Sequence, residues 1–249
     1  MDLNGKVALV TGGAVRVGRS IALALAAAGA DISFSYCSSA DAASATADEI
    51  RAQGRRAFSR KADFKDSDDV KGLVESTVSE LGRLDILVNS AAFWLRTPWA
   101  TLKEKDWDNT LDVTLRGPIF CAKYASPHLA EHGDGLIVNI VDLSAFMPFP
   151  GFSAHSAAKA GLLNATYGLA VELAPAIRVN AIAPGLVLPP PYFSEAQTNA
   201  KAQNTLLRRW GTPEDVAMTV IYFAHASYVT GTVIHVDGGE RLIEGGMNA

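Results

Sequence analysis

Short apolar stretches alternate with longer stretches of helical spacing along the chain. The clearest apolar runs, Val7–Val10 and Leu84–Asn89, predict buried strands. Together with stretches of more mixed composition, the predicted strands lie at Val7–Val10, Asp31–Tyr36, Arg56–Ala62, Leu84–Asn89, Leu136–Val141, Arg178–Ile182 and Thr232–Val236. The stretches between them repeat apolar residues at helical spacing, which predicts helices at Arg19–Ala28, Ala40–Ala52, Asp66–Leu81, Thr101–His132, Ser156–Leu173 and Pro213–Ala226.

This alternation of strands and helices predicts an α/β fold: a doubly wound parallel sheet of seven strands with helices on both faces. We expect a single domain over residues 1–249. Asp66 or Ser67 is expected to cap the third helix, and Pro127 to interrupt the helical stretch 101–132. Leu186–Trp210, which contains three consecutive prolines, is expected to be irregular. In such sheets ligands bind beyond the carboxyl ends of the strands.

Composition narrows the class of protein. The 249 residues are 49% hydrophobic and 19% charged, with a net charge of −4, which is typical of a globular protein and argues against a nucleic-acid partner. Cys37 and Cys121 lack disulfide or metal-ligand spacing, so we expect no metal site and a reducing, cytoplasmic setting. No export signal or membrane-spanning stretch is expected.

A glycine-rich segment, TGGAVRVG, joins the first strand to the first helix. Gly12, Gly13 and Gly18 allow a tight turn, and the amide groups at the start of the helix can bind phosphate. Arg16 stands where a middle glycine is often found, and a guanidinium suits the 2′-phosphate of an adenosine. An ordinary turn between strand and helix remains the alternative.

The end of the second strand indicates which nicotinamide nucleotide would bind. An NAD site commonly has Asp or Glu there to accept a hydrogen bond from the ribose 2′-hydroxyl. This chain has Tyr36-Cys37-Ser38-Ser39 instead. The missing carboxylate, together with Arg16, predicts NADPH as the cofactor.

Taken together, the motifs resemble those of the short-chain dehydrogenase/reductase family over essentially the whole chain. The resemblance rests on Thr11-Gly12 to Gly18, Asp63, Asn89-Ser90-Ala91, Lys159, Pro184-Gly185 and Asp237-Gly238-Gly239. It implies a Rossmann-like sheet, a nicotinamide cofactor, a homotetramer built through the long helices, and a substrate lid at about 186–210. The cofactor-binding residues that it implies are Gly12, Arg16, Val17, Gly18, Ser38, Ser39, Asp63, Asn89, Ser90, Ala91, Lys159, Pro184 and Gly185.

A narrower resemblance is to pteridine reductases. That group has an arginine in the glycine loop, matched by Arg16, and an aspartate in place of the family's catalytic serine, matched by Asp142. It also has an aromatic residue after the fourth strand that stacks on the pterin, matched by Trp94 beside Phe93. A buried structural aromatic is the alternative for Trp94. In the lid, Leu186 and Tyr192 are the further candidates for substrate binding.

The segment SAHSAAKAG departs from the family pattern. The family's proton donor is a tyrosine four residues before the lysine, and here His155 stands in that position, with Lys159 retained. Thr114 aligns with the family's helix asparagine. The expected catalytic set is therefore Thr114, Asp142, His155 and Lys159, with Ser144 as an alternative for the serine position.

These residues allow two classes of function. His155 and Lys159 share one helix face, where the lysine disfavours an imidazolium and Asp142 favours it. We predict an NADPH-dependent reductase of a C=O or C=N bond in a small, planar or aromatic substrate, with His155 as the acid and Asp142 as its orienter or a substrate-binding group. The alternative is non-redox chemistry (cyclisation, isomerisation or elimination), or NADP(H) binding without ordinary turnover.

Overall fold

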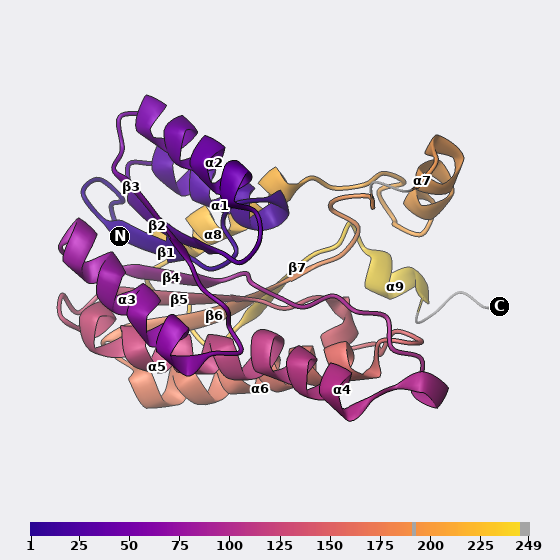
Figure 1. Ribbon diagram of the computed structural model, residues 1–249. Helices are drawn as coiled ribbons and strands as arrows, with labels where there is room; N and C mark the ends of the chain where they lie inside the picture. The colour runs from indigo at the N-terminus through magenta and orange to yellow at the C-terminus, as the bar shows by residue number, and fades with distance from the viewer. Residues whose placement is uncertain (191–192, 245–249) are drawn as a thin grey trace.

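A seven-stranded parallel sheet forms the centre of the computed structural model, which describes residues 1–190 and 193–244 (Figure 1). The strand order is β3-β2-β1-β4-β5-β6-β7, and every neighbouring pair is parallel. The strands are β1 Val7–Val10, β2 Asp31–Tyr36, β3 Ala57–Lys61, β4 Ile86–Asn89, β5 Gly135–Ile140, β6 Ile177–Pro184 and β7 Val233–Val236. The predicted doubly wound sheet is confirmed.

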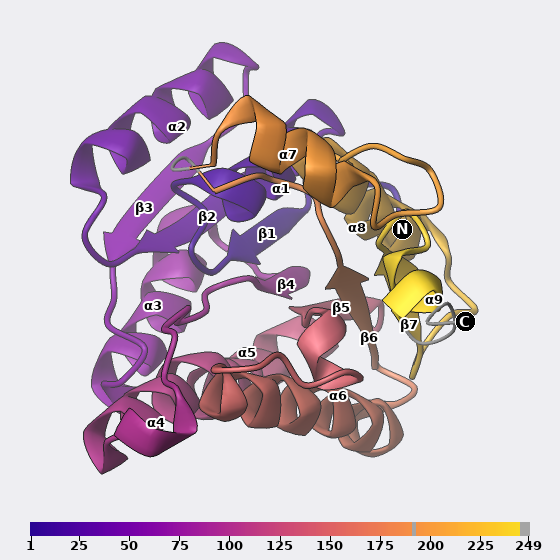
Figure 2. The same cartoon turned by 90° about the vertical axis from the view of Figure 1, so that its right-hand side faces the viewer.

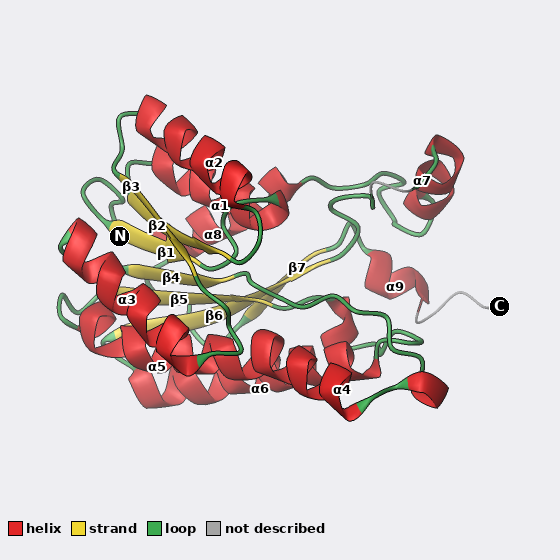
Figure 3. Cartoon of the chain, in the orientation of Figure 1, coloured by secondary structure: helices red, strands yellow, loops and turns green. Residues whose placement is uncertain are grey.

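Helices cover both faces of this sheet (Figure 3). One face carries α1 Arg16–Ala27, α2 Ala40–Ala52 and α8 Pro213–His225. The other carries α3 Ser67–Leu81, α5 Gly117–Ala130 and α6 Ser153–Leu173, with α4 Glu104–Leu111 packed on α6. Two apolar clusters, one on each face, bury successive residues of the central strands, which is why these strands read as continuous hydrophobic runs.

The order of the strands reverses between β1 and β4. The chain builds β1, β2 and β3 outward in one direction, and then returns to place β4 on the opposite side of β1. Connections leaving β1 and β4 therefore diverge and open a crevice at the carboxyl ends of the strands. Figure 2 views the sheet from this end, with α7 (Glu195–Ala202) and α9 (Glu240–Glu244) near the opening.

Several boundaries differ from those predicted. The first and sixth helices each begin three residues earlier than expected, at Arg16 and Ser153. The predicted break at Pro127 is wrong: α5 continues through the proline to Ala130, although its ring removes the hydrogen bond to the Lys123 carbonyl. Asp66 caps α3 as expected, its carboxylate accepting from the Asp68 amide.

The segment 186–210 is more regular than expected. It contains α7, whose start is a capping box: the Ser194 hydroxyl accepts from the Gln197 amide, and the Gln197 side chain accepts from the Ser194 amide. The Trp210 indole donates to the Thr198 carbonyl at 2.8 Å and ties the helix to the following loop. Among the described residues, no helix has both the length and the apolar character needed to cross a membrane.

Candidate active site

The glycine loop forms one end of a groove of about 610 Å³ at the carboxyl ends of the strands. Gly18 permits the close approach of the loop to helix α1, because a Cβ there would lie 2.3 Å from the Gly12 carbonyl oxygen. Nine of the thirteen residues predicted to bind cofactor line this groove: Gly12, Arg16, Val17, Gly18, Ser38, Ser39, Asp63, Ser90 and Ala91. The structure thus brings together residues from the ends of β1, β2, β3 and β4.

Arg16 occupies a conformation that favours glycine, with φ of +54°. Its exposed guanidinium has no hydrogen bond or ion pair within the part of the chain that the structure describes. Ser38 and Ser39 line the same end of the groove, and no carboxylate follows β2 directly. This end of the groove therefore offers one free cation and two hydroxyls.

Thr11 holds the glycine loop to the end of β4. Its Oγ1 accepts hydrogen bonds from the amides of Ser90 and Ala91, at 2.9 and 3.0 Å. The sequence motif contained Thr11, but sequence reasoning gave it no role in the site. Its contribution becomes visible only when strands β1 and β4 are seen to be neighbours.

Asn89 does not line the groove, although we predicted it to bind cofactor. Its side chain is buried and donates to the Asn139 Oδ1 at 2.9 Å and to the Pro118 carbonyl at 3.3 Å. These bonds join β4, β5 and α5 beneath the groove. Alternation along a strand explains the difference, because successive side chains point to opposite faces.

Asp142 and His155 form a direct pair. Asp142 lies two residues beyond β5, and His155 lies in the first turn of α6; His155 Nε2 and Asp142 Oδ2 are 2.7 Å apart. The other carboxylate oxygen accepts from the Ser144 amide at 2.8 Å and from the Ser144 hydroxyl. Ser144, considered as an alternative catalytic serine, thus supports the carboxylate.

Lys159 and Thr114 complete the predicted set. The buried Lys159 ammonium donates to the Ile140 carbonyl at 2.7 Å. Thr114 lies in a π-helical segment, Asp112–Arg116, and its hydroxyl accepts from the Phe93 amide at 3.1 Å. The Phe93 carbonyl lies 3.3 Å from His155 Nδ1, so the backbone of Phe93 links Thr114 to His155.

The charges of the cluster support one another. Burial opposes ionisation of Asp142, but the hydrogen bond from His155 and the charge of Lys159 outweigh it, so the pKa of Asp142 lies below its ordinary value. Burial lowers the pKa of Lys159, and the negative charge of Asp142 opposes that change. We therefore treat Asp142 as a carboxylate at neutral pH.

Aromatic rings border this pair. Trp94 lies against Phe152 with ring centroids 4.4 Å apart, and meets His155 edge-on at 4.6 Å. The Trp94 side chain is nevertheless 57% exposed, and both Trp94 and Phe93 line the groove. Sequence reasoning missed Phe152, although its position three residues before His155 places it beside the histidine at the start of the helix. The buried-aromatic alternative for Trp94 is wrong.

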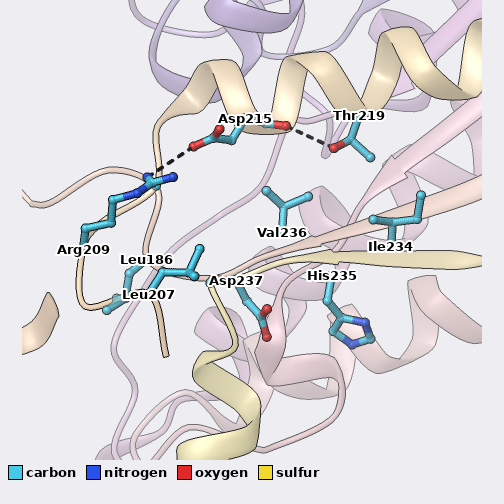
Figure 4. A pocket seen from close by; sticks show the side chains of 11 residues that line it. Leu186, Leu207, Arg209, Asp215, Thr219, Ile234, His235, Val236 and Asp237 are labelled. Carbon is cyan, nitrogen blue, oxygen red and sulfur yellow. Dashed lines mark hydrogen bonds and ion pairs between the residues drawn. The ribbon is translucent and has the colours of Figure 1, made fainter. Parts of the chain in front are cut away.

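Leu186 lies elsewhere. Pro184 ends β6, and Gly185 packs so closely that a Cβ would lie 2.5 Å from a Glu240 carboxylate oxygen. Leu186 lines a second cavity of about 340 Å³, with Leu207 and the Arg209–Asp215 ion pair (Figure 4), and is not among the residues lining the groove. Tyr192 lies outside the described residues. Across residues 1–190 and 193–244, no group of three or more potential metal ligands is found.

Comparison with known proteins bears directly on this site. A family model described as enoyl-(acyl carrier protein) reductase matches residues 13–240. The chain is 36% identical to the 3-oxoacyl-[acyl-carrier-protein] reductase FabG of Staphylococcus aureus over 241 residues, which cover 94% of this chain and 97% of that protein. The chain belongs to the short-chain dehydrogenase/reductase family. It is thus an oxidoreductase of that family. The family resemblance places a tyrosine at the position that His155 occupies in this chain.

Two further relatives of this family are informative. A short-chain dehydrogenase from Burkholderia cenocepacia, solved in complex with NADP, superposes with a TM-score of 0.90 and 36% identity, covering 97% of this chain and all of that one. The (2S)-[(R)-hydroxy(phenyl)methyl]succinyl-CoA dehydrogenase subunit BbsD of Thauera aromatica is 37% identical over 253 residues, covering 98% of this chain and all of that protein.

Proposed function

We propose that the protein is an NADPH-dependent reductase that delivers hydride to a C=O or C=N bond of a small planar substrate. One observation carries the proposal: the groove lined by the predicted cofactor residues ends at Phe93 and Trp94, and both contact His155, the partner of Asp142. Two relatives support it, since one is named a 3-oxoacyl reductase and another is bound to NADP.

The groove fits NADPH by its chemistry. Gly18 lets the loop pack against the start of α1, where a Cβ would meet the Gly12 carbonyl, and the amides there can bind a pyrophosphate. Arg16, Ser38 and Ser39, which line the groove, would bind the 2′-phosphate. The family resemblance assigns the nicotinamide ribose to Lys159, whose buried ammonium donates to the Ile140 carbonyl. When bound, NADPH supplies the hydride. The chain's own residues position the substrate and govern the proton on its reacting heteroatom.

Asp142 and His155 stand where the family resemblance places a serine and a tyrosine. A hydrogen bond of 2.7 Å joins His155 Nε2 to Asp142 Oδ2, so the two side chains act as one unit. Trp94 offers an exposed ring face for a planar substrate. Together with Arg16 and Asp142, this ring supports the narrower pteridine-reductase resemblance, and the phenyl-bearing substrate in the name of the Thauera aromatica relative also fits an aromatic ligand.

Nucleotide titration followed by a substrate screen tests this function. We expect tight binding of NADPH, weaker binding of NADH, and oxidation of NADPH with members of a panel of pterins, cyclic imines, quinones and ketones. His155→Phe should lower turnover and retain NADPH binding. Tight NADPH binding without oxidation by any of the panel would favour the alternative of non-redox chemistry, and failure to bind either nucleotide would refute the proposal.

Three further expectations belong to this proposal. Helix α6 is apolar on nearly all sides, yet Val171 on its outer face is 81% exposed, which supports a second copy of the chain against it and a homotetramer overall. Light scattering should show a tetramer that Val171→Glu dissociates. Residues 186–210 would form the lid of a single-domain enzyme. The two free cysteines fit a reducing cytoplasmic setting.

A further inference from the structure

Neither ring nitrogen of His155 is available to a ligand. Nε2 lies 2.7 Å from a carboxylate oxygen of Asp142, and Nδ1 lies 3.3 Å from the Phe93 carbonyl oxygen. Both partners accept hydrogen bonds, and each ring nitrogen directs its single in-plane bond at one of them. The side chain of His155 is also only 1% exposed. The histidine therefore occupies the tyrosine's place in the sequence without presenting an acid to the substrate.

Asp142 is the member of the pair that reaches accessible surface, with its side chain 21% exposed. A carboxylate has about four lone-pair sites. Three of them take the His155 ring nitrogen, the Ser144 amide and the Ser144 hydroxyl. The remaining site on Oδ2 is the one left for a ligand among the described contacts of Asp142.

A carboxylate at this position changes which bond is reduced most readily. Hydride addition to a ketone builds negative charge on oxygen, and a carboxylate beside that oxygen opposes it. The Ser144 hydroxyl is already engaged with Asp142, and Thr114, whose hydroxyl accepts from the Phe93 amide, is fully buried. A protonated imine brings a positive N–H group instead, which a carboxylate accepts and an aromatic face such as that of Trp94 also attracts.

We infer that the substrate is a cyclic, aromatic-fused imine bound in its protonated form, with its N–H⁺ group donating to Asp142 and its ring lying on Trp94. This inference rests on the proposed reductase function. Hydride adds to the iminium carbon, the C=N π pair becomes the nitrogen lone pair, and the proton stays on nitrogen. The products are the amine and NADP⁺, and no acid residue is required.

In this arrangement Asp142 is the catalytic residue that touches the substrate, and His155 is a positioning residue that acts through it. The charged and titratable groups that act on Asp142 are His155 and Lys159, both from α6. His155 directs Oδ2 and keeps the carboxylate ionised. Replacement of the tyrosine is then consistent with catalysis, because the substrate carries its own proton.

Three probes of matched bicyclic size test this inference: 3,4-dihydroisoquinoline, N-methyl-3,4-dihydroisoquinolinium and the ketone 1-tetralone. We expect NADPH oxidation with both nitrogen compounds, and kcat/KM for the ketone lower by about tenfold or more, the equivalent of one charge-assisted hydrogen bond. The kcat/KM of dihydroisoquinoline should fall as pH rises through its own pKa. That of the N-methyl cation, which cannot lose a proton, should stay level over the same range.

Substitutions separate charge recognition from folding. Asp142→Asn should lower kcat/KM for dihydroisoquinoline by about tenfold, because the protonated imine loses a charge-assisted hydrogen bond. The decrease for the N-methyl cation, which has no N–H and loses only the attraction between charges, should be smaller. NADPH binding should be unchanged, which shows that the variant is folded. Asp48→Asn is the matched control, because it removes the same charge from an exposed carboxylate paired with Arg51 on α2. In His155→Gln, activity toward the N-methyl cation should be lost at a higher pH on acidification, because the pKa of Asp142 rises.

The outcomes distinguish this inference from the proposed function. Reduction of 1-tetralone as efficiently as the imines, or an Asp142→Asn variant with an unchanged imine-to-ketone ratio, would overturn the inference and leave the reductase intact. Absence of NADPH oxidation with all three probes, in protein shown to bind NADPH, would overturn the inference. Only absence of oxidation with the whole panel of pterins, imines, quinones and ketones would overturn the proposed function as well. If His155→Gln does not change the pH at which activity is lost on acidification, His155 does not position Asp142.

Discussion

Replacing Arg16 by glycine separates backbone strain from cofactor recognition. Arg16 has φ of +54°, a conformation that costs an L-residue about 1–2 kcal/mol. Glycine removes that cost but adds about 0.4–1 kcal/mol of unfolded-state entropy. The free energy of unfolding of Arg16→Gly should therefore equal or exceed that of the original chain, by at most about 1.6 kcal/mol, or about 3–6 °C in Tm.

The same substitution should weaken NADPH binding. One charged hydrogen bond contributes about 1.5–3 kcal/mol, so loss of the guanidinium should raise the Kd for NADPH about ten- to hundredfold. The Kd for NADH should not change, since that nucleotide lacks the 2′-phosphate. Fluorescence titration with both nucleotides measures the ratio, and thermal denaturation of the nucleotide-free protein measures the stability.

Arg208 provides a matched control. It also has φ of +54°, but it lies in the loop after α7, where its guanidinium donates to the Gln203 carbonyl at 2.7 Å. Arg208→Gly should relieve the same backbone cost without changing the preference for NADPH. If Arg16→Gly binds NADPH as tightly as the original protein does, Arg16 does not contact the 2′-phosphate and the assignment of NADPH loses its main support.

Three other predictions concern the groove, the sheet and the cysteines. Gly18→Ala places a Cβ 2.3 Å from the Gly12 carbonyl oxygen, about 0.7 Å inside the 3.0 Å limit for such contacts, and the loop must shift. Nucleotide titration should therefore show a Kd for NADPH raised about tenfold or more. Unchanged affinity would mean that the loop does not hold the pyrophosphate. Burial opposes ionisation of Asp85, but its hydrogen bonds to Arg83 and to a backbone amide hold its pKa below the ordinary value. The stabilisation from the Asp85 carboxylate is therefore present above its unfolded-state pKa and is lost as pH falls through its folded-state pKa. Denaturant unfolding should show Asp85→Asn less stable than the original protein by about 1–3 kcal/mol at neutral pH, and by progressively less in acid. An equal difference in stability at all pH values would contradict this prediction. Burial raises the pKa of Cys121 to about 12, whereas Cys37 is exposed and lines the groove. A thiol reagent at neutral pH should therefore modify Cys37 alone, and bound NADPH should slow that modification. Rapid modification of both thiols would refute the packing described around α5.

Local pattern was sufficient for the sheet and for most of the cofactor groove. Continuous apolar runs located β1, β4 and β5, because strands covered on both faces have few polar positions. The more polar β2 and β3 were recognised from their place between helical stretches. The glycine loop and the serines after β2 were recognisable because each is contiguous in the chain and follows a strand directly. Helix α7 was missed, since the neighbouring prolines concealed a capping box that depends only on Ser194 and Gln197.

The sequence by itself determined the fold, the position of the nucleotide groove and the replacement of a tyrosine by His155. Tertiary structure decided what that replacement does. The direction of each side chain at the end of a strand depends on register, so Asn89 turned under the groove while Ser90 and Ala91 lined it. The bonds from His155 to Asp142 and to Phe93 join residues 13 and 62 positions apart, and these long-range contacts make Asp142 the exposed member of the pair.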